Sequence, residues 1–363
     1  MAAVALSRAA SLLHEGLPPT TALDVAVPLV WLGVFVALLV AYRRGAVSPT
    51  ALCGGAAALT ILELFALGVG YHTTVSPARA AMTPPAIQAV QRDHSLYRVV
   101  GLGDVLRPSL AGLYGLQDVR GYDPAHGSAY EQYFRAIFAE TPGWFLDLPP
   151  TAPNPSATRA LDLMNVKYIF AACAVPLTGH PYRLIYRGSG CVYRNATALP
   201  RAFLVHDVGW ATPARAAVLL GQGRVAPRST VLLDPASPDS ARESVRPGYR
   251  LPHGDAVEVI HYDVNAVELT VRSESSAILV LTDAFAPGWQ ADVDGRPTPI
   301  LRADAVFRAV VVGPGVHRVG FTYDPESFKI GGVVSGVALL VWLLLLLRVL
   351  IVPFLARGIV SVL

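Results

Sequence analysis

Short motifs that mark common catalytic, metal-binding and nucleotide-binding sites are missing from this sequence of 363 residues. The nine histidines show neither His-x-His nor His-Glu-x-x-His spacing, and neither a Gly-x-Ser-x-Gly elbow nor a Walker A loop is present. The segment Gly101–Gly103 is too short for a nucleotide loop. Asp292–Gly295 resembles the start of a calcium loop but lacks the downstream Glu, and a hairpin explains it better. We therefore expect neither a metal nor a cofactor, and we assign no catalytic residue.

Lysine is nearly absent, and the charges do not cluster. Of the 29 Lys and Arg residues only Lys167 and Lys329 are lysines, which together with abundant alanine is typical of a GC-rich bacterial genome. The net charge of +3 is scattered along the chain, so no nucleic acid is expected as a partner. No basic cluster next to an apolar run indicates a site for anionic lipids.

The three cysteines leave the redox question open. Cys53 lies inside an apolar run and is predicted to be a small packing residue. Cys173 and Cys191 flank a predicted strand, Tyr182–Arg187. They are either two buried thiols or, in an oxidising compartment, a disulfide.

Long apolar runs are the most informative feature of the chain. They are Val25–Tyr42, Ala51–Gly70 and Ile330–Leu347, and each has about the length needed to cross a hydrocarbon core of ~30 Å as a helix. We therefore predict a membrane protein with three transmembrane α-helices, two within residues 23–70 and one within 329–352. The hydrophobic content of 53% and the mean hydropathy of +0.45 agree with three spans and a large domain.

Arginines at the ends of the apolar runs predict the orientation. Arg43 and Arg44 close the first run and open a short loop, while Arg348 and Arg357 flank the inner end of the third. Short loops rich in Lys or Arg remain in the cytoplasm. We therefore expect a multi-pass protein of a bacterial cell membrane, with its large domain between the second and third spans outside the cytoplasm.

Two terminal segments and one intramembrane charge complete the expected topology. The N-terminal segment 1–22 lacks the compact apolar core of a signal peptide, and residues 353–363 form a cytoplasmic tail. Glu63 is the only charge within a predicted span. Intramembrane carboxylates are costly and often functional, but this one could also reach interfacial water or pair with an arginine.

Residues 71–250 combine strand-like and helical patterns, which predicts an extracytoplasmic α/β or α+β domain of unspecified strand order. The short β-rich runs are Tyr97–Val100, Val166–Ala171, Tyr182–Arg187 and Ala202–Asp207. The helical patterns are Ala125–Glu140, Thr158–Asn165 and Pro213–Gly221. Thr212 is the expected N-cap of the last helix, with Pro213 at the first helical position. Leu148–Pro155 is expected to be a loop and Asp234–Pro247 an exposed linker.

Residues 251–328 predict a small antiparallel β-sandwich, because short β-rich runs alternate with turn residues. The seven runs are Val257–Asp263, Ala266–Ser273, Ala277–Thr282, Trp289–Val293, Thr298–Leu301, Val306–Val312 and Val316–Tyr323. Asp294-Gly295 indicates a two-residue hairpin turn with positive φ at both positions. Trp289 shares its strand parity with the apolar Ala291 and Val293, which favours a structural role in the core over a platform for sugar.

One cluster carries a candidate binding function. Tyrosines interleave with Arg and Asp in a glycine-rich stretch, where rings could stack on sugars and polar groups could bind hydroxyls. The candidate glycan-contacting residues are Arg107, Tyr114, Tyr122, Asp123 and Tyr130. Aromatic packing around a loop junction would explain the same residues without a ligand.

Four segments, in the same order, resemble the C-terminal part of the YfhO-like bacterial membrane proteins. They are YRVVGLGDVLRPSLAGLYGLQDVRGYD, LDLMNVKYIF, VYRNATALPRAFLV and APGWQADVDGRPTPILRADAVFRAVVVGPGVHRVGFTYDPESFKIG. Together with the closing apolar run, the resemblance covers nearly everything from the second span onward.

The resemblance implies a role in cell-envelope glycosylation. YfhO-like proteins are similar to the GT-C class of polytopic glycosyltransferases, which take sugar from a polyprenyl-phosphate donor at the outer face of the membrane. These relatives carry many more N-terminal spans, and the class places its catalytic carboxylate in the first outer loop. This chain begins after that region, so no catalytic residue is carried over. We expect either a fragment of a larger protein or a module that acts with a separate polytopic subunit.

Two functions from different classes stay open. The first is a membrane-anchored extracytoplasmic module of a polyprenyl-phosphate-sugar-dependent glycosyltransferase system, whose partners are the lipid bilayer, the lipid-linked sugar and envelope glycan. The second is a non-catalytic envelope protein that binds glycan or a protein partner. A reading frame directly upstream that encodes many spans and an acidic outer loop would favour the first.

Overall fold

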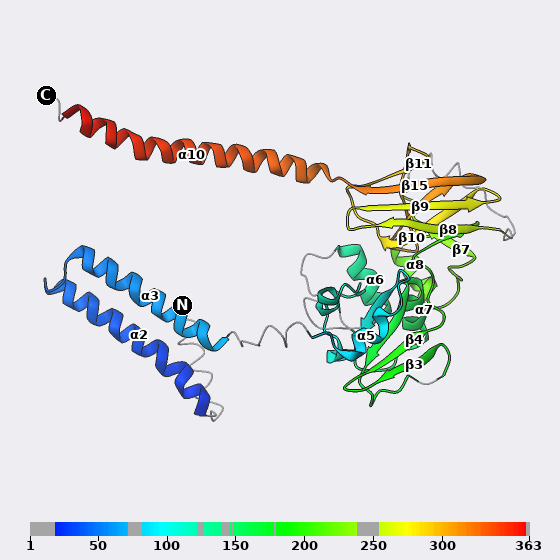
Figure 1. Cartoon of the computed structure of the whole chain (residues 1–363), viewed down its shortest axis with the longest axis horizontal. Coiled ribbons are helices and arrows are strands. Elements are labelled where there is room, and N and C mark those ends of the chain that lie inside the picture. The colour runs from blue at the N-terminus through cyan, green and yellow to red at the C-terminus, as the bar shows by residue number, and fades with distance from the viewer. Residues whose placement is uncertain are drawn as a thin grey trace. The chain divides into compact units, whose positions relative to one another are not determined.

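The computed structural model describes residues 19–71, 82–121, 127–138, 146, 148–177, 179–237 and 254–360 (Figure 1). The chain forms two compact units, Met1–Met82 and Thr83–Leu363. The first unit contains two described helices. The second unit contains three β-sheets, several short helices and a long C-terminal helix.

The first unit is a helical pair. Helices α2 (Pro19–Arg43) and α3 (Pro49–Tyr71) contact each other and are joined by a short turn, in which Gly45 has a φ of 73°. Their apolar stretches that the structure describes, Pro28–Arg43 and Pro49–Phe65, are 10–17 residues long. The helices themselves are 25 and 23 residues long.

Helix α10 (Glu326–Val360) is the candidate membrane helix. Its segment Glu326–Arg348 reaches a mean hydropathy of 2.6. Within the described residues it is the one helix long and apolar enough to cross a membrane. The structure therefore shows a β-rich unit with one candidate span, and the two N-terminal spans stay a prediction.

Sheet A has the strand order β1-β2-β4-β3. Strands β1 (Arg98–Gly101) and β2 (Val166–Ala171) run parallel, whereas β4 (Cys191–Asn195) pairs antiparallel with β2 and with β3 (Tyr182–Arg187). The parallel pair requires a crossover, which the helical segments between β1 and β2 supply. Central strand β2 is almost entirely buried, while the edge strand β3 is mostly exposed.

Short helices surround sheet A. They are α5 (Pro85–Gln91), η1 (Gly103–Val105), η2 (Leu110–Tyr114), α6 (Ser128–Phe138), α7 (Pro155–Leu163) and α8 (Pro213–Gly221). The Asn154 side chain caps α7 by accepting a 2.9 Å hydrogen bond from the Ala157 N–H. Thr212 occupies the N-cap position of α8, as expected from the sequence, but its side chain makes no capping hydrogen bond.

Sheet B has the order β5-β10-β14-β13-β7-β6. Its strands are β5 (Ala202–Val205), β6 (Asp207–Trp210), β7 (Thr230–Leu233), β10 (Ala277–Ala284), β13 (Leu301–Ala303) and β14 (Phe307–Val312). Among its described strands, only β6 and β7 pair in parallel, and α8 forms the crossover between them. The other pairs are antiparallel.

Sheet C is antiparallel throughout, with the order β12-β11-β15-β9-β8. Its strands are β8 (Ala256–Tyr262), β9 (Ala266–Ser273), β11 (Trp289–Val293), β12 (Arg296–Thr298) and β15 (Gly315–Tyr323). Asp294 and Gly295 form the two-residue turn between β11 and β12, with φ values of 54° and 74°. Positive φ at both positions is what the sequence motif requires.

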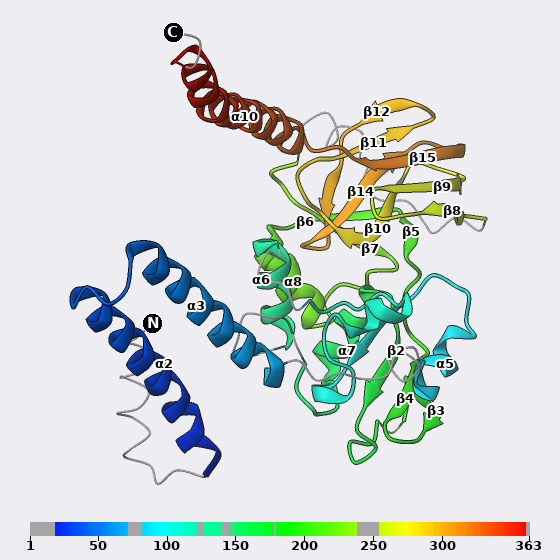
Figure 2. The same ribbon diagram turned by 60° about the vertical axis from the view of Figure 1, so that its left-hand side comes forward.

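Sheet B is covered on both faces. Along β10, Ile278 and Val280 belong to the core shared with helices α6–α8, whereas Leu279 and Leu281 belong to the core between sheets B and C. In Figure 2, sheet B accordingly lies between sheet C and helices α6 and α8. Each such buried side chain contributes about 1.5–3 kcal/mol.

The sandwich starts earlier in the chain than expected. Strands β5, β6 and β7 precede residue 251, in the region expected to form a separate α/β domain, yet they pair within sheet B. The reason is that β10 and β14 carry apolar side chains on both faces of sheet B. Both faces must therefore be covered by other elements. The cover on the second face comes from the α/β region, so one continuous core joins the two regions.

The expected strand Thr298–Leu301 is divided between two sheets. β12 ends at Thr298 in sheet C, and β13 begins at Leu301 in sheet B. Pro299 lies between them and has no N–H to donate to a ladder, so the chain changes sheet at this position.

A fully buried carboxyl group lies in the turn between β13 and β14. Asp304 has a φ of 45° and is 0% exposed. Its Oδ1 accepts a 2.9 Å hydrogen bond from the Leu232 N–H, while Oδ2 has no partner among the described residues. Burial raises the pKa of Asp304 to about 7, and the hydrogen bond from Leu232 offsets only part of this effect.

We expect Asp304→Asn to stabilise the protein more at about pH 8 than at about pH 5. The folded carboxyl keeps its proton up to about pH 7, whereas the unfolded one ionises near 3.8. Between these values the unfolded state binds fewer protons, so the free energy of unfolding of the parent falls as pH rises, by at most roughly 4 kcal/mol. The Asn variant lacks this loss. Urea unfolding of the detergent-solubilised protein at both pH values measures the difference.

The matched control is Asp263→Asn, the same change at an exposed position. Its stability should follow the parent at both pH values. If Asp304→Asn also follows the parent, the Asp304 carboxyl titrates normally and the proposed cause is wrong.

Candidate functional site

Of the five predicted glycan-contacting residues, the three that the structure describes do not gather at one site. Arg107 is exposed and lies 3.5 Å from Asp104 in an ion pair. Tyr114, at the end of η2, packs against the core on one face of sheet A, and its carbonyl oxygen accepts a 2.9 Å hydrogen bond from Gln91 Nε2. Tyr122 and Asp123 lie outside the described residues.

Tyr130 belongs to a different environment. It lies on α6, packs against the main core on the opposite face of sheet A, and donates a 2.7 Å hydrogen bond from its hydroxyl to the Val119 carbonyl. Burial raises its pKa to about 12. The structure therefore places Tyr130 as a packing residue, on the opposite face of sheet A from Tyr114.

The structure joins Cys173 and Cys191 in a disulfide. Cys191 is buried at the start of β4, and Cys173 lies in the loop after β2. Of the two states that the sequence left open, the structure therefore contains the bonded one.

Two further residues singled out in the sequence lie on α3. Cys53 is a free, exposed thiol. Glu63 is half-buried. Among the described residues, no group of three or more His, Cys, Asp or Glu is arranged to hold a metal.

Trp289 turns its ring toward the sandwich core. The ring centroid lies 3.6 Å from Cζ of Arg308 and 5.3 Å from the ring centroid of Tyr323. This position agrees with the sequence prediction that Trp289 and Ala291, two residues apart on one strand, face the same core. Gly288, immediately before it, has a φ of 96°, which suits the sharp entry of the chain into β11.

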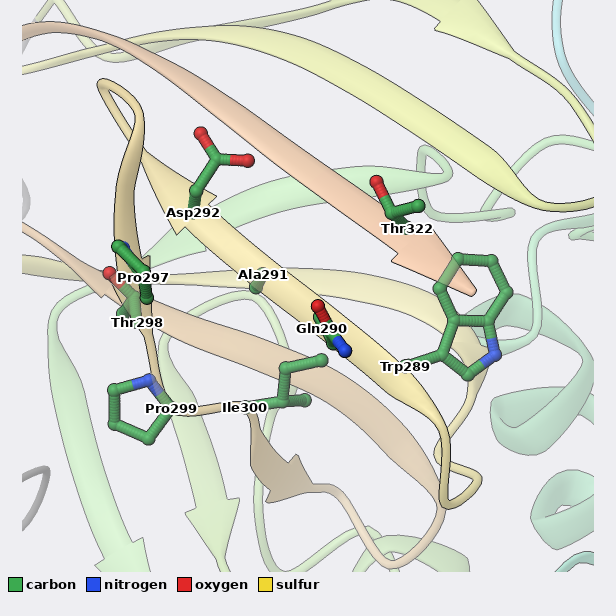
Figure 3. Close-up of a pocket in the computed structure, with 9 residues that line it drawn as sticks. All are labelled: Trp289, Gln290, Ala291, Asp292, Pro297, Thr298, Pro299, Ile300 and Thr322. Carbon is green, nitrogen blue, oxygen red and sulfur yellow. The ribbon is translucent and has the colours of Figure 1, made fainter. Parts of the chain in front are cut away.

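A shallow hollow of about 500 Å³ lies on the β11–β12 side of sheet C (Figure 3). Its lining residues come from β11, β12, the segment after β12 and the end of β15: Trp289, Gln290, Ala291, Asp292, Pro297, Thr298, Pro299, Ile300 and Thr322. Trp289 and Asp292 lie at opposite ends of β11 in this view. The amide, carboxylate and hydroxyl groups can bind sugar hydroxyls, while Pro299 and Ile300 offer an apolar wall.

Hydrogen bonds fix one end of the hollow. Asp292 Oδ1 accepts a 3.0 Å hydrogen bond from the Gly295 N–H, within the hairpin turn. Asp294 closes the same turn by accepting a 2.8 Å hydrogen bond from the Arg318 N–H and lying 2.7 Å from His317 Nδ1. The contact with His317 lowers the pKa of Asp294, and the contact with Asp294 raises the pKa of His317.

A second polar site lies at the buried end of the sandwich, around Asp283. Arg98 donates to Asp283 Oδ1, Arg201 Nη1 lies 3.3 Å from the same oxygen, and Arg308 Nη2 lies 2.9 Å from Oδ2. The Tyr262 hydroxyl lies 3.0 and 3.1 Å from the two oxygens. We call these five residues the Asp283 cluster.

Burial and charge compete in the Asp283 cluster. Burial raises the pKa of Asp283, but the three guanidiniums outweigh it and hold the pKa below its usual value. Burial and the charge of Arg98 lower the pKa of Arg201 to about 10, and burial lowers the pKa of Arg308. Burial and the charge of Asp283 raise the pKa of Tyr262, which stays a neutral hydrogen-bond donor.

Sequence reasoning missed the Asp283 cluster. Its signal was present, because Asp283 and Arg308 are charges inside otherwise apolar strands, AILVLTDA and FRAVVV. A charge inside a buried strand requires a partner. The sequence does not reveal that the partners are Arg98 and Arg201, which come from distant segments.

Comparison with known families identifies the C-terminal part. Residues 253–335 match the family described as "Bacterial membrane protein YfhO". The match covers sheet C, strands β10, β13 and β14, and the beginning of α10. It confirms the resemblance to YfhO-like proteins for this part of the chain. No curated protein matches, and no solved structure matches.

We expect Asp283→Asn to destabilise the protein by about 3–5 kcal/mol, the cost of removing one partner from a buried ion pair. The change leaves three guanidiniums without a countercharge in a buried site. Chemical denaturation of the detergent-solubilised protein measures the effect. Asp263→Asn is again the exposed control, with an expected change below about 0.5 kcal/mol. Equal stabilities of the two variants would contradict the structural role of Asp283.

Proposed function

We propose that this chain is a membrane-anchored, extracytoplasmic module of a glycosyltransferase system that uses a polyprenyl-phosphate-linked sugar. In this proposal the β-rich unit binds glycan, and a separate polytopic membrane subunit supplies catalysis. The match of residues 253–335 to a bacterial membrane protein family and the apolar helix α10 support the membrane part of the proposal.

The position of the hollow next to α10 is the observation that carries the proposal. Thr322, in the wall of the hollow, precedes the start of α10 at Glu326 by only four residues. The connecting residues are held in place, since the Asp324 N–H donates a 2.9 Å hydrogen bond to the Gly288 carbonyl. If α10 spans the bilayer, a glycan in the hollow lies within reach of a lipid-linked donor at the membrane surface.

The chemistry of the hollow suits a polyhydroxylated ligand. Gln290 and Thr322 are exposed and lie opposite each other in the β11–β15 register. With Asp292 and Thr298 they present both donors and acceptors above an apolar wall. Arg107 and Tyr114, on their own surface, are kept as a second place of glycan contact in this proposal.

The disulfide supports the proposed location. Disulfides such as Cys173–Cys191 persist outside the cytoplasm and are rare within it. Arg43, Arg44 and Arg348 give the same orientation by the positive-inside rule, provided that α2 and α3 also cross the membrane.

A non-catalytic envelope protein that binds glycan or a protein partner is the alternative. The same hollow on sheet C supports this alternative, because a protein can bind glycan there without catalysing a reaction. The gene neighbourhood separates the two functions: an adjacent gene for a polytopic protein with an acidic outer loop supports the transferase system.

The proposed topology predicts the activity of reporter fusions. A reporter enzyme that folds only outside the cytoplasm should be active when fused after Asp324 and silent when fused after Leu363. A cytoplasm-specific reporter at the same two positions should give the opposite pattern and serves as the control. An active external reporter after Leu363 would overturn the orientation.

The proposed glycan site predicts the behaviour of a double variant. Gln290→Ala/Thr322→Val should weaken binding of the full chain to cell-envelope oligosaccharides on a glycan array by at least about tenfold, a loss of ~1.4 kcal/mol. The melting temperature should not change, because both side chains are exposed.

A matched control removes similar groups elsewhere on sheet C. Glu258→Ala/Thr270→Val changes β8 and β9, on the side of the sheet away from β11, and should bind like the parent. Equal binding by parent and Gln290→Ala/Thr322→Val would locate the glycan site elsewhere. Absence of any binding by the parent would overturn the glycan-binding role.

A further inference from the structure

The Asp283 cluster contains more positive than negative charge. Arg98, Arg201 and Arg308 all form salt bridges to the single carboxylate of Asp283, which leaves an excess of two positive charges. The side chains of Arg201 and Arg308 are only 1% and 2% exposed. Buried charges are stable only when they are paired, so this excess calls for a further anion.

Unused hydrogen-bond donors lie at the same place. Arg201 Nη2, Arg308 Nε and Arg308 Nη1 are buried and have no hydrogen-bond partner among the described residues. A buried donor without a partner costs about 1–3 kcal/mol. Guanidinium N–H groups are strong donors to the oxygens of phosphate and carboxylate groups.

One side chain connects this site with the hollow. The indole of Trp289 lies on the Arg308 guanidinium, with Cζ 3.6 Å from the ring centroid, and the same residue lines the hollow. Trp289 is half-buried. Figure 3 shows it at the end of the hollow opposite Asp292, the carboxylate that would repel an anion.

We propose that Arg308 and Arg201 form a binding site for a phosphate group, which enters from the hollow when the Trp289 indole turns aside. The excess of two positive charges matches a phosphate monoester, which carries about −1.5 to −2 at neutral pH. A carboxylate ligand would leave one charge uncompensated. This site does not depend on the proposed glycan role, because it uses different side chains.

The test is thermal unfolding of the full chain in uncharged detergent micelles, titrated with inorganic phosphate at constant ionic strength. A ligand that binds the folded state raises the melting temperature with the logarithm of its concentration once that exceeds Kd, so phosphate should stabilise the parent whereas chloride and acetate should not. Arg308→Lys keeps a positive charge near Asp283 but removes the two unused donors, Nε and Nη1. It should weaken the apparent affinity for phosphate by at least about tenfold.

Arg302→Lys is the matched control. Arg302 lies opposite Arg308 in the β13–β14 register, but it is 30% exposed and contacts Asp234 and the Phe285 ring instead. Its phosphate affinity should equal that of the parent. Arg201→Lys is a second variant in the site and should weaken phosphate binding even if Arg308→Lys fails to fold.

A second experiment with lipids distinguishes a lipid headgroup from a free phosphate ion as the source of the phosphate group. The parent in nanodiscs of phosphatidylcholine, with or without phosphatidic acid, reports on a headgroup, while inorganic phosphate reports on a free ion. Stabilisation by either ligand that Arg308→Lys or Arg201→Lys reduces and Arg302→Lys leaves unchanged supports the site. No stabilisation by phosphate beyond that given by chloride and acetate, or equal stabilisation of all variants by an adventitious ion only, overturns it.

Discussion

The carboxylate of Asp283 connects all three sheets of the second unit. Asp283 lies on sheet B and binds Arg98 of sheet A, Arg308 of sheet B and the Tyr262 hydroxyl of sheet C. Buried ion pairs add little net stability compared with apolar packing, but they tolerate few alternative arrangements. The carboxylate therefore links the sandwich to the α/β region at one point, through partners on all three sheets.

The two cores on either side of sheet B reinforce this arrangement. β10 alternates its side chains between them, with Val280 toward the helices and Leu279 toward sheet C. A one-residue slip of this strand would leave two apolar cores largely intact, because both parities are apolar, and register in such strands is weakly specified by hydrophobicity alone. The polar Asp283 at the end of the strand breaks this ambiguity, because only one register places it among the arginines.

Local signals predicted local structure well. The strand boundaries of Val166–Ala171 and Tyr182–Arg187, helix Pro213–Gly221 and the Asp294-Gly295 turn are observed as expected, since each depends on neighbouring residues. Long-range features were not accessible. The sequence could not show that β5–β7 join sheet B, that Tyr130 faces a different core from Tyr114, or that Arg98 and Arg201 converge on Asp283, since each needs the tertiary arrangement.

Sheet B contains strands from both sides of residue 253, which limits where the chain can be cut or recombined. The family match begins at residue 253, whereas two strands that border its part of sheet B, β5 and β7, come from before that point. A polypeptide cut there would present β10 and β13 as open, apolar edges, which invite pairing with other chains. The region that matches the family model is thus smaller than the region that can fold alone. Exchange of the C-terminal region between relatives must carry the preceding strands with it, or find compatible ones already in place.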